Sequence, residues 1–159
     1  MKAAILTAAF LLSLLPGTAL GEEAQTGRAL MDAGIAHLKA GEPEKAALRF
    51  QEAVHLMPNN PDGHLQLGFS LQKLGKFREA IASYQGALSL NARHRYAPEA
   101  YFNMGVSSDE LGEGENALGY MKKSLQAYTD RADYGGVYRV GRYIEHLTLK
   151  YPEPSATDR

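Results

Sequence analysis

The sequence predicts an all-α protein, a right-handed superhelical solenoid of about three helix-turn-helix repeats followed by a C-terminal capping helix. Three observations lead to this fold class. One pattern of small and apolar residues occurs three times, a glycine divides each copy into two amphipathic stretches, and one more amphipathic stretch follows the third copy. With 45% hydrophobic and 22% charged residues in 159, the composition is typical of a globular domain.

Residues 1–21 have the pattern of a secretory signal peptide. Lys2 gives a short positive start, the run 3–15 is apolar, and small residues stand at Ala19 and Gly21. This order of charge, apolar run and small-x-small site is what signal peptidase recognises. The run is too short to span a bilayer comfortably. We expect cleavage after Gly21, with cleavage after Ala19 as the alternative.

The predicted signal places the mature chain outside the cytoplasm. We expect a periplasmic or secreted protein that starts with a flexible segment, residues 22–26, and has no membrane insertion after cleavage. The sequence contains no cysteine, which excludes a lipoprotein anchor, disulfides, thiolate catalysis and cysteine-ligated metals.

The repeat has a period of 34 residues. Gly34 and Gly68 are 34 residues apart, whereas Gly68 and Gly105 are 37 apart, so three extra residues lie between the second and third copies. A period of this length indicates a repeat architecture in which each unit is one helical hairpin. The predicted domain covers residues 27–150, with repeats at about 27–60, 61–94 and 98–131.

Glycine has two roles in every repeat. Gly41, Gly75 and Gly112 separate the two amphipathic stretches, where the first helix must end and the chain must turn back. The other three glycines fall inside the first helix, where Gly costs about 1 kcal/mol relative to Ala. Their recurrence indicates a close helix contact. The second helix contributes small residues at Ala46, Ala80 and Ala117 and larger ones beside them at Phe50, Tyr84 and Met121.

These positions resemble the tetratricopeptide repeat family, whose pattern runs aromatic-x-x-Leu-Gly-x-x-Tyr, Ala-x-x-x-Phe and Pro. The resemblance covers about residues 27–128. The proline after the second and third units is missing, and His64 and Ser108 take aromatic positions of the pattern. The matching residues are Gly34, Ala46, Phe50 and Pro58, then Leu67, Gly68, Ala80 and Tyr84, then Tyr101, Gly105 and Ala117.

Residues 131–150 form one more helical pattern, with an apolar side that includes Val137, Ile144 and Leu147. The segment is either a capping helix or the first helix of a degenerate fourth unit, because the last repeat of a solenoid needs a cover. Prolines follow it, and we expect the tail, residues 151–159, to be flexible.

Motifs for chemistry are missing from the sequence. No two of the five histidines have the i, i+4 spacing of a helical metal site, and Ser107-Ser108-Asp109 has no activating base in an evident arrangement. We therefore expect no enzyme, no metal and no cofactor. The net charge of −1 also disfavours a nucleic-acid partner.

The first helix of each repeat carries a second apolar stripe. Met31 and Ile35 lie about 120° around the helix from the stripe that faces the partner helix. The equivalent residues are Leu65 and Phe69 in the second repeat and Phe102 and Val106 in the third. In the tetratricopeptide family these positions line the concave groove. The resemblance therefore implies a partner-binding groove of these six residues, flanked by Gln66, Asn103, Arg139 and Arg142. The alternative is that the six residues pack between repeats or under the C-terminal helix.

Some members of the family clamp a terminal carboxylate in this groove with Lys, Asn and Arg. Here the matching positions include Gln66, Asn103 and Glu99, and the Glu99 charge would repel a carboxylate. A protein segment with apolar anchors fits better. The basic run Arg93-His94-Arg95-Tyr96, within the three-residue insertion, is expected to be a solvated turn.

From these observations we expect a non-catalytic, exported adaptor that binds a protein or peptide segment in its groove and supports the assembly of an envelope complex. The alternative is a structural scaffold that associates with itself into a homo-oligomer.

Overall fold

The computed structural model describes the backbone of residues 16–152 and the side chains of residues 21–152. Within that range the chain forms seven helices and no strand, which confirms the predicted all-α class. The helices are α2 (Pro16–Lys39), α3 (Pro43–Leu56), α4 (Pro61–Lys73), α5 (Phe77–Leu90), α6 (Ala97–Glu110), α7 (Gly114–Thr129) and α8 (Tyr134–Lys150).

The N-terminal helix starts earlier than the repeat pattern. α2 begins at Pro16 and continues through Gly21, so residues 22–26, expected to be flexible, are helical here. The apolar run 3–15 of the predicted signal peptide lies outside the described residues, as does most of the predicted tail, residues 153–159.

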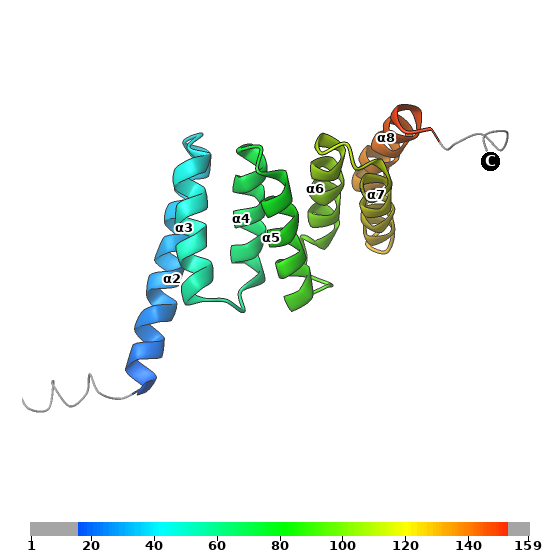
Figure 1. The fold of residues 1–159 in the computed structure, drawn as a ribbon. Helices are drawn as coiled ribbons and strands as arrows, with labels where there is room; N and C mark the ends of the chain where they lie inside the picture. The colour runs from blue at the N-terminus through cyan, green and yellow to red at the C-terminus, as the bar shows by residue number, and fades with distance from the viewer. Residues whose placement is uncertain (1–15, 153–159) are drawn as a thin grey trace, which may run out of the picture.

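The helices form a row in which each one packs against its neighbours in the sequence (Figure 1). The pairs α2–α3, α4–α5 and α6–α7 are the three predicted repeats, and α8 packs against α7 at the red end of the row. The first helices also contact one another, α2 with α4 and α4 with α6. The right-handed solenoid of three helix pairs and a final helix is therefore confirmed, and it gives the first helices a shared face.

The turn inside each repeat depends on a left-handed glycine. Gly41, Gly75 and Gly112 have φ of +73°, +71° and +75°, a region that residues with a Cβ avoid. The helix before each glycine ends there and the next helix returns antiparallel to it, as the sequence predicts.

The other repeated glycines allow the two helices of a repeat to approach closely. A Cβ at Gly68 would lie 2.9 Å from the Tyr84 ring, closer than real Cβ atoms come. The first and third repeats have the same arrangement: a Cβ at Gly34 would lie 2.6 Å from Phe50, and one at Gly105 would lie 2.7 Å from Met121. The close contact predicted from the register is therefore present in all three repeats.

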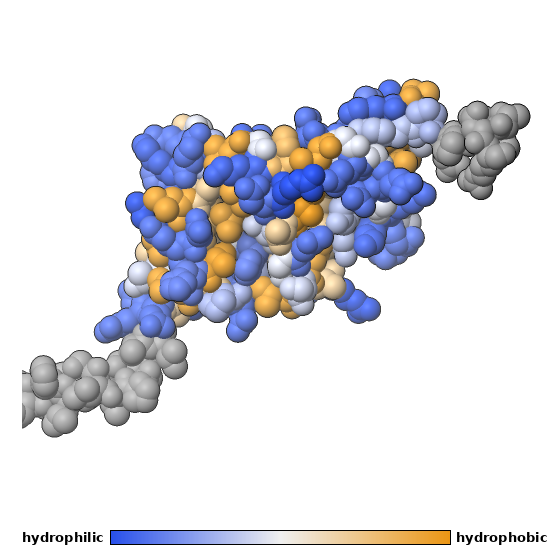
Figure 2. Space-filling model, viewed as in Figure 1, coloured by the Kyte–Doolittle hydropathy of each residue, from blue (hydrophilic) through white to orange (hydrophobic). Residues whose placement is uncertain are grey.

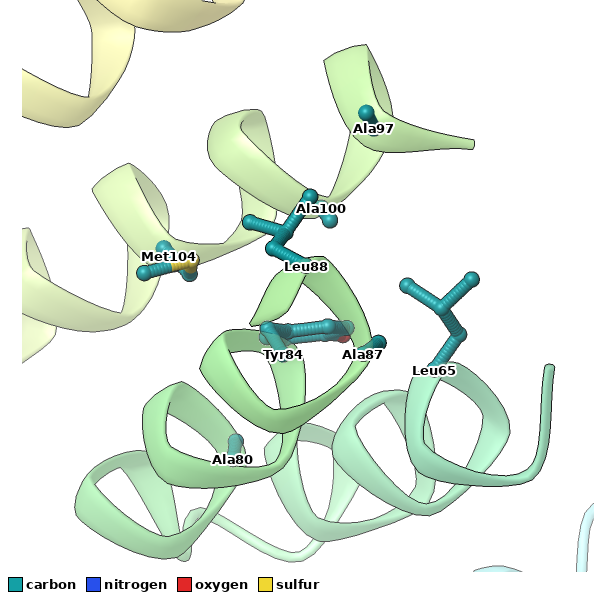
Figure 3. Close-up of a cluster of buried hydrophobic side chains, with 8 residues drawn as sticks. All are labelled: Leu65, Ala80, Tyr84, Ala87, Leu88, Ala97, Ala100 and Met104. Atoms are coloured by element: carbon teal, nitrogen blue, oxygen red, sulfur yellow. The ribbon is translucent and has the colours of Figure 1, made fainter. Parts of the chain in front are cut away.

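Two clusters of buried residues form the core. In the central cluster Tyr84, 1% exposed, lies among residues from three helices, α4, α5 and α6 (Figure 3). Small side chains surround it and let the helices come close, and the long Met104 side chain fills the gap on the α6 side. The second cluster lies under α8 and consists of Ala117, Met121, Tyr128, Val140 and Leu147.

A buried carboxylate attaches the last helix to the third repeat. Asp109, at the end of α6, is 6% exposed and accepts hydrogen bonds from the Tyr143 hydroxyl at 2.9 Å, the Lys150 Nζ at 2.6 Å and the Tyr151 hydroxyl at 3.0 Å. These three donors come from α8 and the residue after it, so Asp109 fixes the C-terminal half of α8 against α6.

Candidate functional site

The first helices α4 and α6 enclose a cavity of about 290 Å³ on their shared face. Leu65, Phe69 and Ala100 contribute apolar surface to it, and Gln66, Glu99 and Asn103 contribute polar groups. The complete lining is Leu65, Gln66, Phe69, Tyr84, Tyr96, Glu99, Ala100 and Asn103. A cavity of this size and polarity accommodates an apolar side chain and provides hydrogen bonds for the backbone beside it.

A second cavity of about 430 Å³ adjoins the first, between α2 and α4. Gln66 and Tyr96 line both cavities, so the two form one continuous surface, which we call the first-helix groove. The second cavity is more charged. Its lining adds Arg28, Met31, Asp32, Ile35, Met57, Asn60, Asp62 and Arg95.

Six of the ten predicted site residues line the first-helix groove. They are Met31, Ile35, Leu65, Gln66, Phe69 and Asn103. Phe69 is 36% exposed, and the Lys73 ammonium lies 5.2 Å from the centre of its ring. Leu65 is only 7% exposed and also belongs to the central core cluster, so it forms the floor of the groove.

The other four predicted residues line neither cavity, and they belong to α8 or pack near it. Phe102 and Val106 pack against the cluster under α8, which is the alternative that the sequence left open. The Arg139 guanidinium lies 5.1 Å from the Phe102 ring and donates a hydrogen bond to the Tyr128 hydroxyl. Arg142 is exposed and forms an ion pair with Glu145 at 3.0 Å. The C-terminal helix thus covers the second apolar stripe in the third repeat.

Sequence reasoning missed Tyr96. The basic run before α6 was expected to be a solvated turn, but Tyr96 lines both cavities. Arg131, a residue distant in the sequence, donates hydrogen bonds to the carbonyl oxygens of His94 and Arg95. The His94 ring and the Arg95 guanidinium also approach Asp62 in α4, at 3.3 Å and 3.6 Å. These long-range contacts, which no local pattern reveals, attach the loop to α4 and to Arg131, which follows α7.

Hydrogen bonds between α4, α5 and α6 hold the groove floor in place. The Gln72 side chain donates to the Asn103 carbonyl oxygen at 3.2 Å and accepts from the Tyr84 hydroxyl at 3.3 Å. Burial raises the pKa of Tyr84 well above its usual range, so this hydroxyl keeps its proton and remains a donor at neutral pH.

Glu99 is the charged residue of the cavity between α4 and α6. Its Oε2 atom is buried and has no hydrogen-bond partner within the described residues. Burial, and then the neighbouring Glu99 carboxylate, raise the pKa of Tyr128 to about 12. The Glu99 carboxyl group therefore lies at the wall of a largely apolar cavity, close to the Tyr128 hydroxyl.

The described part of the chain contains no cluster that could perform metal chemistry. No group of three or more His, Asp and Glu residues within it could hold an ion. Ser107 and Ser108, which the sequence analysis considered as a hydroxyl run, are both fully buried. None of the helices between residues 16 and 152 is both long and apolar enough to cross a bilayer.

Comparisons with known proteins agree with this architecture. Residues 37–97 match the family model described as "Tetratricopeptide repeat", which supports the resemblance inferred from the sequence. No curated protein sequence matches the chain.

Three solved structures show the same fold. A type III secretion (T3SS) complex from Aeromonas hydrophila has a chain that is 23% identical with a TM-score of 0.74, covering 96% of this chain and 98% of that one. The Yersinia enterocolitica type III secretion translocator chaperone SycD, in an alternative dimer, is 21% identical with a TM-score of 0.72, covering 80% and 96%. The TPR2B domain of yeast Sti1, in a complex with pHsp70, is 16% identical with a TM-score of 0.70, covering 81% and 98%. At these identities the likeness shows the tetratricopeptide-repeat fold.

Proposed function

We propose that this chain is a non-catalytic adaptor that is exported from the cytoplasm, binds a segment of another protein in the first-helix groove and supports the assembly of an envelope complex. The observation that carries the proposal is the groove itself. Apolar side chains, among them the partly exposed Phe69, lie beside polar and charged groups on the face that α2, α4 and α6 have in common.

The chemistry of the groove favours a protein segment over a small metabolite. Its two cavities form one long, open surface, whereas a small molecule is usually enclosed on most sides. Extended or helical segments dock through spaced apolar side chains, with polar groups fixing the backbone. Two proteins of the same fold also support the proposal, a translocator chaperone and a domain in a complex with pHsp70.

Phe69→Glu is expected to abolish partner binding while the helical circular dichroism stays unchanged, because Phe69 is partly exposed in the groove and a carboxylate there would face apolar surface. The measurement is affinity capture from an envelope extract, with Leu149→Glu as the matched control. Leu149 is 84% exposed on α8, so this control adds the same charge outside the groove. Equal capture by both variants would contradict a groove-binding adaptor.

Export predicts a shortened chain in the cell. Because the signal pattern ends in a small-x-small site, the protein recovered from the periplasm or medium is expected to begin at Glu22. Cell fractionation followed by mass spectrometry of the N-terminal peptide measures this directly. A cytoplasmic protein that retains residues 1–21 would refute the proposed export and leave the binding proposal standing.

A self-associating scaffold is the second candidate, and uncovered apolar surface at both ends of the row favours it. At the N-terminal end, Leu30, Leu48 and Leu56 line a cavity of about 720 Å³, and hydrophobic residues are visible over α3 there in Figure 2. At the other end, Tyr134 and Tyr138 are 80% and 72% exposed. This candidate predicts a concentration-dependent molar mass in light scattering and no need for another protein.

A further inference from the structure

We propose that the first-helix groove selects a segment carrying a lysine or arginine, whose cation binds Glu99 beside an apolar anchor packed on Phe69. This inference rests on the proposed function and specifies the chemistry of the partner. The segment is an extended stretch of another protein, recognised by an apolar side chain and a positive charge close to it in sequence.

The first argument is an unsatisfied carboxylate oxygen. Glu99 lies in the first turn of α6 and lines the cavity between α4 and α6. Its carboxyl group interacts with the Tyr128 hydroxyl, but its buried Oε2 has no hydrogen-bond partner among the described residues. A buried charged oxygen without a donor is unfavourable, and most such groups in proteins are paired. The last side-chain torsion of Glu is broad, so rotation about it can bring this oxygen to the cavity that the side chain lines. The groove thus lacks one donor, at a defined position.

The second argument is that the neighbouring cations have other partners. Arg139 lies over the Phe102 and Tyr128 rings, at 5.1 Å and 5.5 Å, and donates to the Tyr128 hydroxyl. Arg95, on the other side, is directed toward Asp62. Among the described residues no lysine, arginine or histidine comes within 4.0 Å of the Glu99 carboxylate. The negative charge of Glu99 is therefore available to a partner.

The third argument is that the Glu99 carboxylate and the Phe69 ring line the same cavity. Glu99 comes from α6 and Phe69 from α4, and the Gln72 side chain joins these two helices by donating to the Asn103 carbonyl oxygen at 3.2 Å. The Lys73 ammonium lies over the Phe69 ring but does not line the cavity. In an extended segment, side chains two residues apart point to the same side about 7 Å apart, which suits a basic residue on Glu99 and an apolar one on Phe69.

The test is a selection from a phage-displayed library of random dodecapeptides against the purified full chain and three variants. The variants are Glu99→Gln, Glu99→Lys and, as the matched control, Glu79→Lys, since Glu79 is an exposed residue of α5. Circular dichroism of each protein confirms that it is folded before selection.

The wild type and the Glu79→Lys control are expected to enrich Lys or Arg about two positions from a large apolar residue. Glu99→Lys is expected to enrich Asp or Glu at that position instead. A synthetic peptide taken from the wild-type selection should bind Glu99→Gln at least about tenfold more weakly, because a charge-assisted hydrogen bond is lost.

Three outcomes overturn the inference. Selected peptides with apolar anchors but no charge preference, or a basic preference that persists in Glu99→Gln and Glu99→Lys, would show that Glu99 only supports Tyr128 inside the fold. The adaptor proposal would survive that result. A library that yields no binder to the wild type would contradict the adaptor proposal and the inference together. If Glu99→Lys does not fold, the Glu99→Gln comparison alone decides.

Discussion

Asp109→Ala is expected to lower the free energy of unfolding by about 2–3 kcal/mol and to loosen the C-terminal half of α8, because it removes the acceptor of three hydrogen bonds at a buried site. Truncating one partner of a buried charged pair is more damaging than its net contribution suggests, since the remaining groups lose their solvation without replacement. Urea unfolding measures the free energy, and hydrogen exchange of the α8 amides shows where it is lost.

Glu110→Ala is the matched control, since Glu110 is the next residue of α6 and is exposed. It is expected to change stability by less than about 0.5 kcal/mol. Equal effects of the two substitutions, or unchanged exchange in α8 of the Asp109 variant, would contradict the anchoring role.

The same site predicts a dependence on pH. Burial alone would raise the pKa of Asp109, but hydrogen bonds from Lys150, Tyr143 and Tyr151 hold it below its usual range. A carboxyl whose pKa is lower in the folded state stabilises the fold above its unfolded pKa of about 4, and the contribution is lost as the pH falls through the folded pKa. Asp109→Asn should therefore lose less stability than the wild type on acidification below about pH 4. If the urea midpoints of Asp109→Asn and the wild type fall in parallel as the pH is lowered across that range, the predicted role of Asp109 in the pH dependence is excluded.

The role of Asp109 shows what the sequence leaves undetermined. In the sequence it is the third residue of a Ser-Ser-Asp run with no evident partner. Its partners Tyr143, Lys150 and Tyr151 lie 34, 41 and 42 residues further along the chain. The helical pattern of residues 131–150 predicts the helix α8. It does not predict that the Asp109 carboxylate holds this helix, because that role exists only once α8 has packed against α6. Tyr96 was missed for the same reason, because Arg131 and Asp62 position its loop.

The repeat itself was predictable because its determinants are local. A glycine with positive φ stops a helix wherever it stands, so Gly41, Gly75 and Gly112 fixed the three hairpins. Periodicity then assigned one face of each first helix to its partner. The second stripe was harder to assign, because periodicity does not say what covers it. α8 covers that stripe at Phe102 and Val106, and it leaves Phe69 in an open cavity.

Gly68→Ala is expected to destabilise the protein by about 1–3 kcal/mol, although alanine is the better helix former. The reason is the approach of α5 to α4. A Cβ at this position would lie 2.9 Å from Cδ1 and Cε1 of Tyr84, and that ring is 1% exposed and bonded through its hydroxyl to Gln72. Core residues and the hydrogen bond to Gln72 hold the ring in place. The added methyl group therefore has to push α4 and α5 apart or displace the ring from this position, and the central core loosens in either case.

The matched control substitution is expected to change the stability in the opposite direction. Gly119 lies within α7, and a Cβ there would meet nothing within 4 Å, so Gly119→Ala is expected to stabilise the protein by up to about 1 kcal/mol. Thermal and urea unfolding of the two variants compare close packing with helix propensity in one protein. A gain in stability in both Gly68→Ala and Gly119→Ala would mean that Tyr84 moves easily. The recurring glycines would then need another explanation. A loss of stability in Gly68→Ala with a gain in Gly119→Ala would show that close contact between the two helices is the reason for a glycine at this position of the 34-residue repeat.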